Sequence, residues 1–387
     1  MSEKINKKKI KRILSELESY KKKDFTFSNG HILGSMCNQP HPIAVKAYTS
    51  FLETNLGDPA LFPGTKQIEK KLVTFIKDLL NTPPTGQGQI VTGGTEGNIT
   101  AMWIAKQLTH KNEIIIPASA HFSFQKIASL MNMKLKSIPL TNDYTVDFLK
   151  LKKEISSETA AVVGIAGSTD LGVIDPIQEI GELCEKEHIF FHVDAAYGGF
   201  IIPFLKELGY HLPTFDFSVN GVSSICLDAH KMGYAAIPLG TLVIRDSSWL
   251  EEISVESRCV SSEKQAGILG TRSGGPVAAA YAVTQYLGKK GYQDIMQECM
   301  KLTEYAKKRI QEIGLPLVYE NPPLNILAIK LRNVDDIDDQ LTQKGWKINK
   351  MNHLSAIRLV LKPNISTSII DEFILELQKT CMDVGEL

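Results

Sequence analysis

The stretch IVTGGTEGNITAMWIAKQL, residues 90–108, reads as a short apolar strand, a glycine turn and then a helix. Within the helix, Ile99, Met102 and Trp103 recur at a spacing that places them on one face. A strand that turns through glycines directly into such a helix is the repeating unit of α/β proteins. The stretch therefore predicts an α/β fold, provided that the unit repeats along the chain.

Apolar strands and amphipathic helices do alternate on both sides of this unit. Helical patterns cover residues 65–80, 124–133 and 177–187, and strands are predicted at 113–117, 135–140, 159–167, 189–196, 224–228 and 240–246. Such alternation predicts a mostly parallel sheet with helices on both faces. Ligands of such sheets bind beyond the carboxyl ends of the strands, so we expect the functional residues at that edge.

The two ends of the chain follow other patterns. Near the C-terminus, strands at 324–331 and 356–361 combine with helices at 333–343 and from Ser366 onward, which predicts a small α+β unit. Near the N-terminus, a lysine-rich amphipathic helix is expected to be solvated, with nucleic-acid binding as the alternative. We expect an N-terminal helical segment (1–60), a large domain (61–290) and a small C-terminal α+β domain (291–387).

Composition and charge narrow the range of partners. The 387 residues are 43% hydrophobic and 22% charged, and Lys plus Arg equals Asp plus Glu at 43 each. A chain without net charge has no overall field that attracts nucleic acid or a membrane surface, so we expect small-molecule or protein partners. The six cysteines show no metal-binding spacing, and no segment reads as a signal peptide or membrane span, so we expect a cytoplasmic protein without a metal.

The glycine turn is a candidate anion site. Gly93 and Gly94 allow a tight turn with close backbone approach, and Thr95 is expected to cap the helix while its free N–H groups face an anion. The turn is not a P-loop, because the Gly-Lys-Ser/Thr ending is missing. A phosphate cradle is one interpretation, and an ordinary capped turn is the other.

A carboxylate and an amine follow two later strands. Asp194 ends the strand in IFFHVDAAYGG (189–199), where a buried carboxylate is costly unless a cation or strong donors meet it. A turn-forming aspartate is the alternative; metal ligation with His192 lacks a third ligand. Lys231 follows the strand in SICLDAHKMGY (224–234) and is a candidate functional amine. The alternative is that this lysine is a solvated residue at the end of a strand. A phosphate cradle, a carboxylate and an amine at one sheet edge are what pyridoxal phosphate requires.

Six motifs in this order resemble the pyridoxal-phosphate group II amino-acid decarboxylases: GGTEGN (93–98), SAHFSF (119–124), AGSTDLG (166–172), HVDAAYGG (192–199), DAHKMG (228–233) and GTRSGG (270–275). The resemblance covers nearly the whole chain. It is closest to the archaeal L-tyrosine/L-aspartate decarboxylases, through the stretches at 34–43 and 51–70, and ISVE (253–256) also resembles the bacterial histidine decarboxylases. The motifs are specific for the family and weak for the substrate.

The resemblance implies a fold-type-I enzyme and a role for each matching residue. Lys231 would form the Schiff base with the cofactor, Asp194 would keep the ring nitrogen protonated, and His121 would stack on the ring. The remaining cofactor contacts would come from Gly94, Thr95, Thr169, Ala196 and His230. For His121 and His230, the alternative is a satisfied polar residue at a strand end.

Two arginines and an active site shared between two subunits complete the predicted features. Arg358 resembles the fold's usual partner for the substrate α-carboxylate, with a strand-edge surface arginine as the alternative. Arg272 is a further cation without an assigned role. The resemblance also implies a homodimer with shared active sites, in which LGDPALF (56–62) reaches the pocket of the partner.

One position departs from the family pattern. The loop tyrosine that protonates the α-carbon in these decarboxylases corresponds here to Cys259. A thiol is more acidic than a phenol but shorter, so it either delivers the proton or leaves the carbanion to react with oxygen. A small shift in the loop alignment, or a passively packed cysteine, is the alternative.

Together these features predict a pyridoxal-phosphate-dependent L-amino-acid α-decarboxylase acting on L-tyrosine or L-aspartate. A decarboxylating aldehyde synthase, or another lyase on the same scaffold, is the second hypothesis. A binding protein that has lost catalysis is the third, and the intact Lys231, Asp194 and His121 argue against it.

Overall fold

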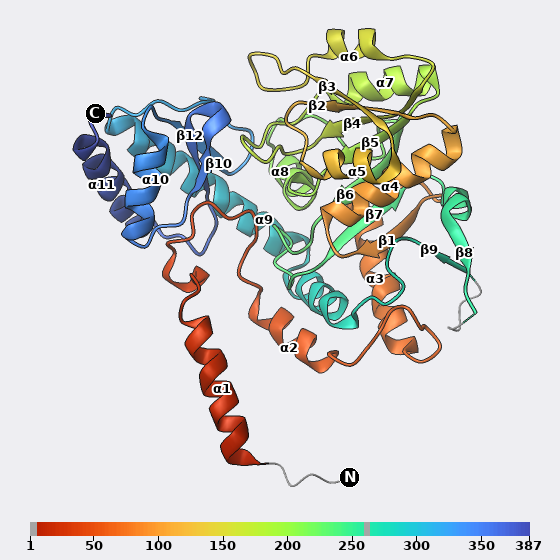
Figure 1. The fold of residues 1–387 in the computed structure, drawn as a ribbon, viewed down its shortest axis with the longest axis horizontal. Coiled ribbons are helices and arrows are strands. Elements are labelled where there is room, and N and C mark those ends of the chain that lie inside the picture. The colour runs from red at the N-terminus through yellow and green to blue at the C-terminus, as the bar shows by residue number, and fades with distance from the viewer. Residues whose placement is uncertain (1–5, 259–263) are drawn as a thin grey trace.

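A seven-stranded sheet forms the centre of the computed structural model, which describes residues 6–258 and 264–387 (Figure 1). Its strands lie in the order β1-β7-β6-β5-β4-β2-β3. Their bounds are β1 Gln87–Val91, β2 Glu113–Pro117, β3 Lys134–Ile138, β4 Thr159–Ile165, β5 Phe190–Asp194, β6 Val222–Leu227 and β7 Gly240–Ile244. The five strands from β6 to β3 are parallel to their neighbours, whereas β7 is antiparallel to both β6 and β1. The predicted mostly parallel sheet is confirmed.

Helices cover both faces of the sheet because its strands are apolar on both sides. One face packs against α4 (Gly94–Thr109) and α5 (Ser123–Met131). The other face packs against α3 (Pro63–Leu79), α7 (Ile177–Glu187), α8 (Ile202–Glu207) and the first part of α9 (Gly274–Glu312). Alternate strand residues serve the two faces, so that Val193 and Ile225 enter the second core while Phe190 and Cys226 enter the first.

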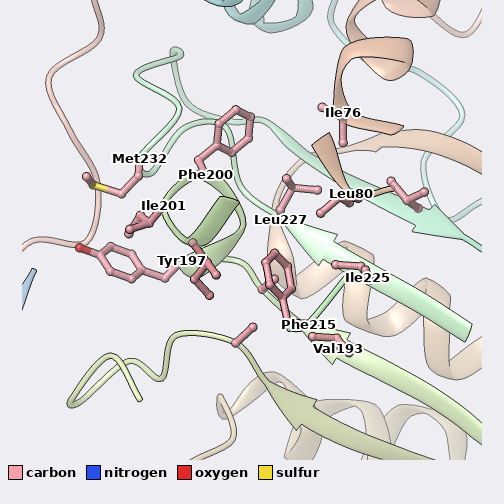
Figure 2. Close-up of a cluster of buried hydrophobic side chains, with 14 of the residues drawn as sticks. Ile76, Leu80, Val193, Tyr197, Phe200, Ile201, Phe215, Ile225, Leu227 and Met232 are labelled. Atoms are coloured by element: carbon pink, nitrogen blue, oxygen red, sulfur yellow. The ribbon is translucent and has the colours of Figure 1, made fainter. Parts of the chain in front are cut away.

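The core beneath the ends of β5 and β6 is built from aromatic and branched side chains. Figure 2 shows Phe200 and Phe215 packed among Val193, Ile225 and Leu227, all of them almost completely buried. Aromatic rings of this size bury large apolar areas and hold the strand ends in place. The residues that follow these strands therefore project from a rigid base.

A second, smaller sheet lies toward the C-terminus. Its strands, in the order β10-β12-β11, are antiparallel and span Ile326–Lys330, Ala356–Val360 and Asn349–Met351. Helices α10 (Val334–Gln343) and α11 (Thr367–Asp383) share an apolar core with this sheet and with the last turns of α9. This is the predicted small α+β unit. The domain boundary predicted at residues 290 and 291 falls inside α9, just after its helical geometry breaks at Gly288, and the division into three domains stays a prediction.

The N-terminal helices differ in how they pack. Helix α2 (Pro42–Ser50) lies against α9, whereas α1 (Lys7–Lys21) has no buried residue and stands away from the body (Figure 1). The small elements that remain are β8 (Ser254–Glu256), β9 (Lys264–Ala266), α6 (Phe148–Glu154) and the 3-10 turns η1 (Phe27–Asn29), η2 (Gly198–Phe200), η3 (Ser247–Ile253) and η4 (Asn352–Leu354). Within the described ranges, no helix has the length and apolar character needed to cross a membrane.

Candidate active site

A cavity of about 300 Å³ lies at the carboxyl edge of the large sheet. Its walls come from the segments that follow β1, β2, β4, β5 and β6, as expected when parallel strands end side by side. The lining residues are Thr92, Gly93, Gly94, Thr95, Glu96, Asn98, Ser119, His121, Ile165, Gly167, Thr169, Asp194, Ala196, Tyr197, Asp228, His230 and Lys231. Among the described residues, the cavity thus brings together every site residue predicted from the sequence except Arg358.

The glycine turn after β1 is built differently from the prediction. The residue that caps α4 is Gly93, which has a φ of 152° and no side chain to bond the first turn. The predicted cap at Thr95 is wrong, because Thr95 already lies inside the helix. Glu96 turns back instead and accepts hydrogen bonds from the backbone N–H and the hydroxyl of Thr92, each at 2.7 Å. The start of α4 faces the cavity without a covering cap side chain, which suits an anion.

Three segments meet closely at Gly94. A Cβ atom at this position would lie 3.2 Å from the Ala196 side chain and 3.3 Å from Asp228 Oδ2. A Cβ atom at Gly240, the first residue of β7, would lie 2.5 Å from Asp228 Oδ1. Glycines at these two positions keep the backbone accessible to a ligand that approaches the helix start.

The carboxylate of Asp194 is buried and oriented by two donors. Its Oδ1 accepts the backbone N–H of Ala196 at 3.1 Å, and its Oδ2 accepts from Asn98 Nδ2 at 2.8 Å. The residue is only 7% exposed. Both of these hydrogen-bond donors are neutral, so the carboxylate can stabilise a cationic group in the cavity.

Lys231 forms an ion pair with Asp228 at the mouth of the same cavity. The distance from Lys231 Nζ to Asp228 Oδ2 is 3.4 Å. Burial by itself lowers the pKa of Lys231, but the nearby carboxylates of Asp228 and Asp194 outweigh it and raise the pKa above the usual value. Burial raises the pKa of Asp228, although Lys231 opposes this shift. The amine is therefore held as an ammonium by the carboxylate three residues before it.

The two predicted cofactor histidines are fixed by backbone contacts. His121 Nδ1 accepts the N–H of Ser123 at 3.2 Å, and burial lowers the pKa of His121, which favours the neutral imidazole. His230 Nδ1 lies 2.7 Å from the carbonyl oxygen of Leu239, with Nε2 3.7 Å from Asp228 Oδ2. Both rings line the cavity, so each histidine makes a satisfied polar contact and also faces the cavity.

Arg358 lies outside the cavity but reaches a residue of its wall. Its NH1 group donates to the Thr169 carbonyl at 2.7 Å, and its NH2 group donates to the Gly34 carbonyl at 2.6 Å. It belongs to the central strand β12 and is 3% exposed, so the alternative of a strand-edge surface arginine is wrong. Its Nε atom is buried and has no partner among the described residues.

Arg272 does not line the cavity. Arg272 NH1 donates to the Ile90 carbonyl of β1 at 3.1 Å and lies 3.4 Å from Glu69 Oε1, so it links β1 to α3. Cys259 lies outside the described residues, and its predicted role as the proton donor stays a prediction.

Residues 31–320 match the pyridoxal-dependent decarboxylase conserved domain. The chain belongs to this family. It is 43% identical to the probable L-tyrosine/L-aspartate decarboxylase of Methanothermobacter thermautotrophicus, over 91% of this chain and 98% of that protein. It is also 43% identical to the L-aspartate/L-glutamate decarboxylase of Pyrococcus horikoshii, over 95% of this chain and 96% of that protein.

The fold of this pyridoxal-dependent decarboxylase also matches a solved fold-type-I enzyme. The sphingosine-1-phosphate lyase of Burkholderia pseudomallei superposes with a TM-score of 0.89 and 25% sequence identity, over 97% of this chain and 90% of that chain. The predicted fold class, the carboxy-lyase activity and the pyridoxal-phosphate cofactor are therefore confirmed.

The cavity of the decarboxylase fits pyridoxal phosphate. Asp228 Oδ1 and Ser119 Oγ are buried polar atoms with no partner in the part of the chain that the structure describes, as expected where a bound group completes the contacts. The cradle at Gly94 is a space that a side chain would fill. Lys231 supplies the amine and Asp194 the carboxylate that this cofactor needs.

The sequence interpretation missed several residues of the site. Asp228 ends a buried strand just as Asp194 does, so the same argument applies to it. Asn98 and Ser119 gave no such signal, because their role depends on contacts with distant segments. His192 was considered only as a metal ligand; both of its ring nitrogens are occupied by Ser224 and Asn98.

Proposed function

We propose that this chain is an L-amino-acid α-decarboxylase whose preferred substrate is L-aspartate, with L-tyrosine as the second candidate. The observation that carries the proposal is a single cavity that holds Lys231, Asp194 and the glycine turn at the start of α4. Both relatives described above are named for aspartate, and the one from Methanothermobacter is also named for tyrosine. The products would be carbon dioxide with β-alanine or with tyramine.

Bound pyridoxal phosphate supplies an aldehyde that takes up the substrate amine and a ring that accepts the electron pair left when carbon dioxide departs. In our proposal, Lys231 holds the cofactor and later releases the product amine. Asp194 keeps a proton on the ring nitrogen through the carboxylate that Asn98 and Ala196 orient. The neutral His121 would stack on the ring.

We propose that the start of α4 binds the phosphate. Gly94 and Thr95 would donate from the backbone, with His230 beside them, while Thr169 and Ala196 contact the ring. Close packing of Gly94 against Ala196 and Asp228 supports this arrangement, because a side chain at position 94 would crowd the start of the helix that is proposed to bind the phosphate.

Arg358 is proposed to orient the α-carboxylate of the substrate. Its unpartnered Nε atom supports this role, because a buried guanidinium nitrogen without an acceptor favours binding of an anion. The two backbone carbonyls that it already bonds would hold the group in place. Two parallel hydrogen bonds to the carboxylate would fix the orientation of the substrate and thereby determine which of its bonds breaks.

We further propose a cytoplasmic homodimer with shared active sites. The segment at 56–62 is expected to reach the pocket of the partner, and Leu61 within it is 67% exposed, as suits a residue that a second subunit covers. The cysteine pattern of the sequence supports a reducing compartment.

The test is mass spectrometry of the products formed by the purified, cofactor-loaded enzyme in air. Tyrosine, aspartate, glutamate and histidine are supplied separately, and Lys231→Ala serves as the control. An amine from aspartate alone, or from aspartate and tyrosine, is the expected result. An amine formed only from glutamate or histidine would overturn the substrate proposal.

The same experiment decides between decarboxylation and aldehyde formation. An aldehyde synthase would consume one oxygen per turnover and release aldehyde, carbon dioxide, ammonia and hydrogen peroxide. An oxygen electrode with catalase as the control detects this outcome. Such an outcome would favour the aldehyde-synthase hypothesis, whereas a chain that forms no product from any amino acid would favour the hypothesis of a protein that has lost catalysis.

A further inference from the structure

Four buried polar side chains are linked by successive hydrogen bonds behind the cavity. Ser224 Oγ lies 2.8 Å from His192 Nδ1, and His192 Nε2 lies 2.9 Å from Asn98 Oδ1. Asn98 Nδ2 then donates to Asp194 Oδ2 at 2.8 Å. The chain ends on the carboxylate that the proposed function places at the cofactor ring nitrogen.

The donor and acceptor at each link follow from the last link. A carboxylate only accepts, so Asn98 must direct its amide nitrogen at Asp194 and its oxygen at His192. His192 must therefore carry its proton on Nε2. Its bare Nδ1 then accepts the hydroxyl proton of Ser224. Every group in the chain has a single orientation that satisfies all of its partners.

The fold supports this arrangement from three elements. His192 and Asp194 lie two residues apart on β5 and face the same side, Ser224 lies beside His192 on β6, and Asn98 comes from α4 above them. His192, Ser224 and Asn98 are at most 1% exposed. Burial lowers the pKa of His192 to about 4, so the ring stays neutral and keeps one proton.

Without His192, the amide of Asn98 would be free to rotate. A rotated amide would place its oxygen against the Asp194 carboxylate, and the two oxygens would repel each other. The second amide hydrogen offers little resistance, because its other contact within the described residues is Ser123 Oγ at 3.2 Å. An Asp194 carboxylate displaced in this way would no longer stabilise a cationic ring nitrogen.

We propose that His192, with Ser224 behind it, is a positioning residue that locks the Asn98 amide and thereby keeps the Asp194 carboxylate hydrogen-bonded and aimed into the cavity. The inference rests on the proposed function for the identity of the group that Asp194 meets. The hydrogen-bond chain itself is a property of this polypeptide and can be tested in the cofactor-free protein.

The first experiment compares two substitutions of similar size. His192→Gln retains a donor toward Asn98 and an acceptor toward Ser224, whereas His192→Leu fills the space without either. Thr303→Val, which removes a buried hydroxyl bonded to the Cys299 carbonyl at 2.7 Å, controls for loss of a buried polar contact elsewhere. The readouts are the dissociation constant of pyridoxal phosphate, kcat and KM.

We expect His192→Leu to weaken pyridoxal-phosphate binding and to lower kcat by about 10- to 100-fold each, with a smaller change in KM. His192→Gln should stay within about 5-fold of the wild type, and Thr303→Val within about 2-fold. If His192 had only a structural role, the Leu variant would bind the cofactor at least as tightly as the Gln variant, because an apolar leucine suits a buried site. A Leu variant that binds the cofactor as tightly as the Gln variant would therefore overturn the proposal.

The second experiment needs neither cofactor nor turnover. Nitrogen-15 NMR of the cofactor-free wild-type protein at neutral pH should show the His192 ring protonated on Nε2. Ser224→Ala removes the donor to Nδ1 and should leave the proton on Nε2, because the Asn98 oxygen still accepts it; this variant keeps the test available if the Leu variant does not fold. A ring protonated on Nδ1 in the wild type would reverse the chain and refute the inference.

The two experiments separate this inference from the proposed function. If no amino acid yields an amine, the proposed substrate class fails while the tautomer and the cofactor affinity still decide the role of His192. If turnover is normal and the tautomer is wrong, only the inference fails.

Discussion

Two sets of charged side chains in the protein differ in the kind of partner that they meet. At the edge of the large sheet, Asp194, Asp228 and Lys231 carry both signs of charge and face a cavity. Around β12 of the small sheet, Arg358 and Lys362 are both cations, and their hydrogen-bond acceptors are backbone carbonyls. The first set holds charge ready for a ligand, whereas the second uses charge to join segments.

The second set fixes a single stretch of chain beside the site. Lys362 is fully buried, and its ammonium donates to the carbonyls of Ser35 and Cys37 at 2.9 and 2.8 Å. The next residue, Asn38, donates to the Lys231 carbonyl at 2.8 Å. Removing a ligand-facing charge should therefore affect activity, and removing a segment-joining charge should affect stability.

The largest effect on activity is expected from Asp194→Ala. Loss of the carboxylate removes the group that stabilises positive charge at the cofactor ring, so kcat should fall at least about 1,000-fold. The melting temperature of the cofactor-free protein should change by less than about 3 °C, because the desolvation cost of the charge disappears with it. Steady-state kinetics and calorimetry measure the two quantities, and a variant that retains turnover would break the comparison.

Arg358→Met should affect stability and substrate binding together. Two buried carbonyls, at Gly34 and Thr169, lose their donor, which costs about 2–4 kcal/mol in the free energy of unfolding. If the guanidinium also binds the substrate carboxylate, KM should rise at least about 10-fold. Urea unfolding and kinetics distinguish the two effects. Arg358→Lys is the control, and unchanged stability would show that the group does not join the segments.

Lys362 sharpens the comparison through its pH dependence. Burial lowers its pKa to about 8, below the ordinary lysine value. Between these two values the unfolded chain binds a proton that the folded protein does not, so the free energy of unfolding rises with pH there. Relative to Lys362→Met, the wild type should gain about 3 kcal/mol between pH 8 and pH 10.5. A flat difference in urea unfolding over this range would contradict the lowered pKa of Lys362.

An exposed ion pair provides the smallest expected effect. Lys290 and Asp294 lie 2.7 Å apart on α9, with side chains 77% and 58% exposed. Because solvent screens such pairs, Lys290→Ala should change the melting temperature by less than about 2 °C and leave kcat unchanged. Differential scanning calorimetry checks this. If Lys290→Ala changed the melting temperature as much as Lys362→Met does, burial would not explain why the buried charges matter more than this exposed pair.

Local patterns in the sequence predicted the individual elements well. Strand β2 at 113–117 and helix α7 at 177–187 have the predicted bounds, because apolar periodicity and helix ends depend on neighbouring residues. The antiparallel direction of β7 and the continuation of α9 through residue 290 were not predicted. Strand direction depends on the path of the intervening loop, which local periodicity does not encode.

For the site, the sequence alone determined which chemical groups follow the strands: the glycine turn, Asp194, His121 and Lys231. A carboxylate or amine that is costly to bury can be recognised in the sequence where it follows an apolar strand, and parallel strands end at one edge of the sheet. Only the tertiary structure decided that Asp228 pairs with Lys231, that Arg358 bonds two distant carbonyls, and that His192 orients Asn98. These roles come from contacts between separate segments, and a hydrogen bond exists only where packing brings donor and acceptor within about 3 Å.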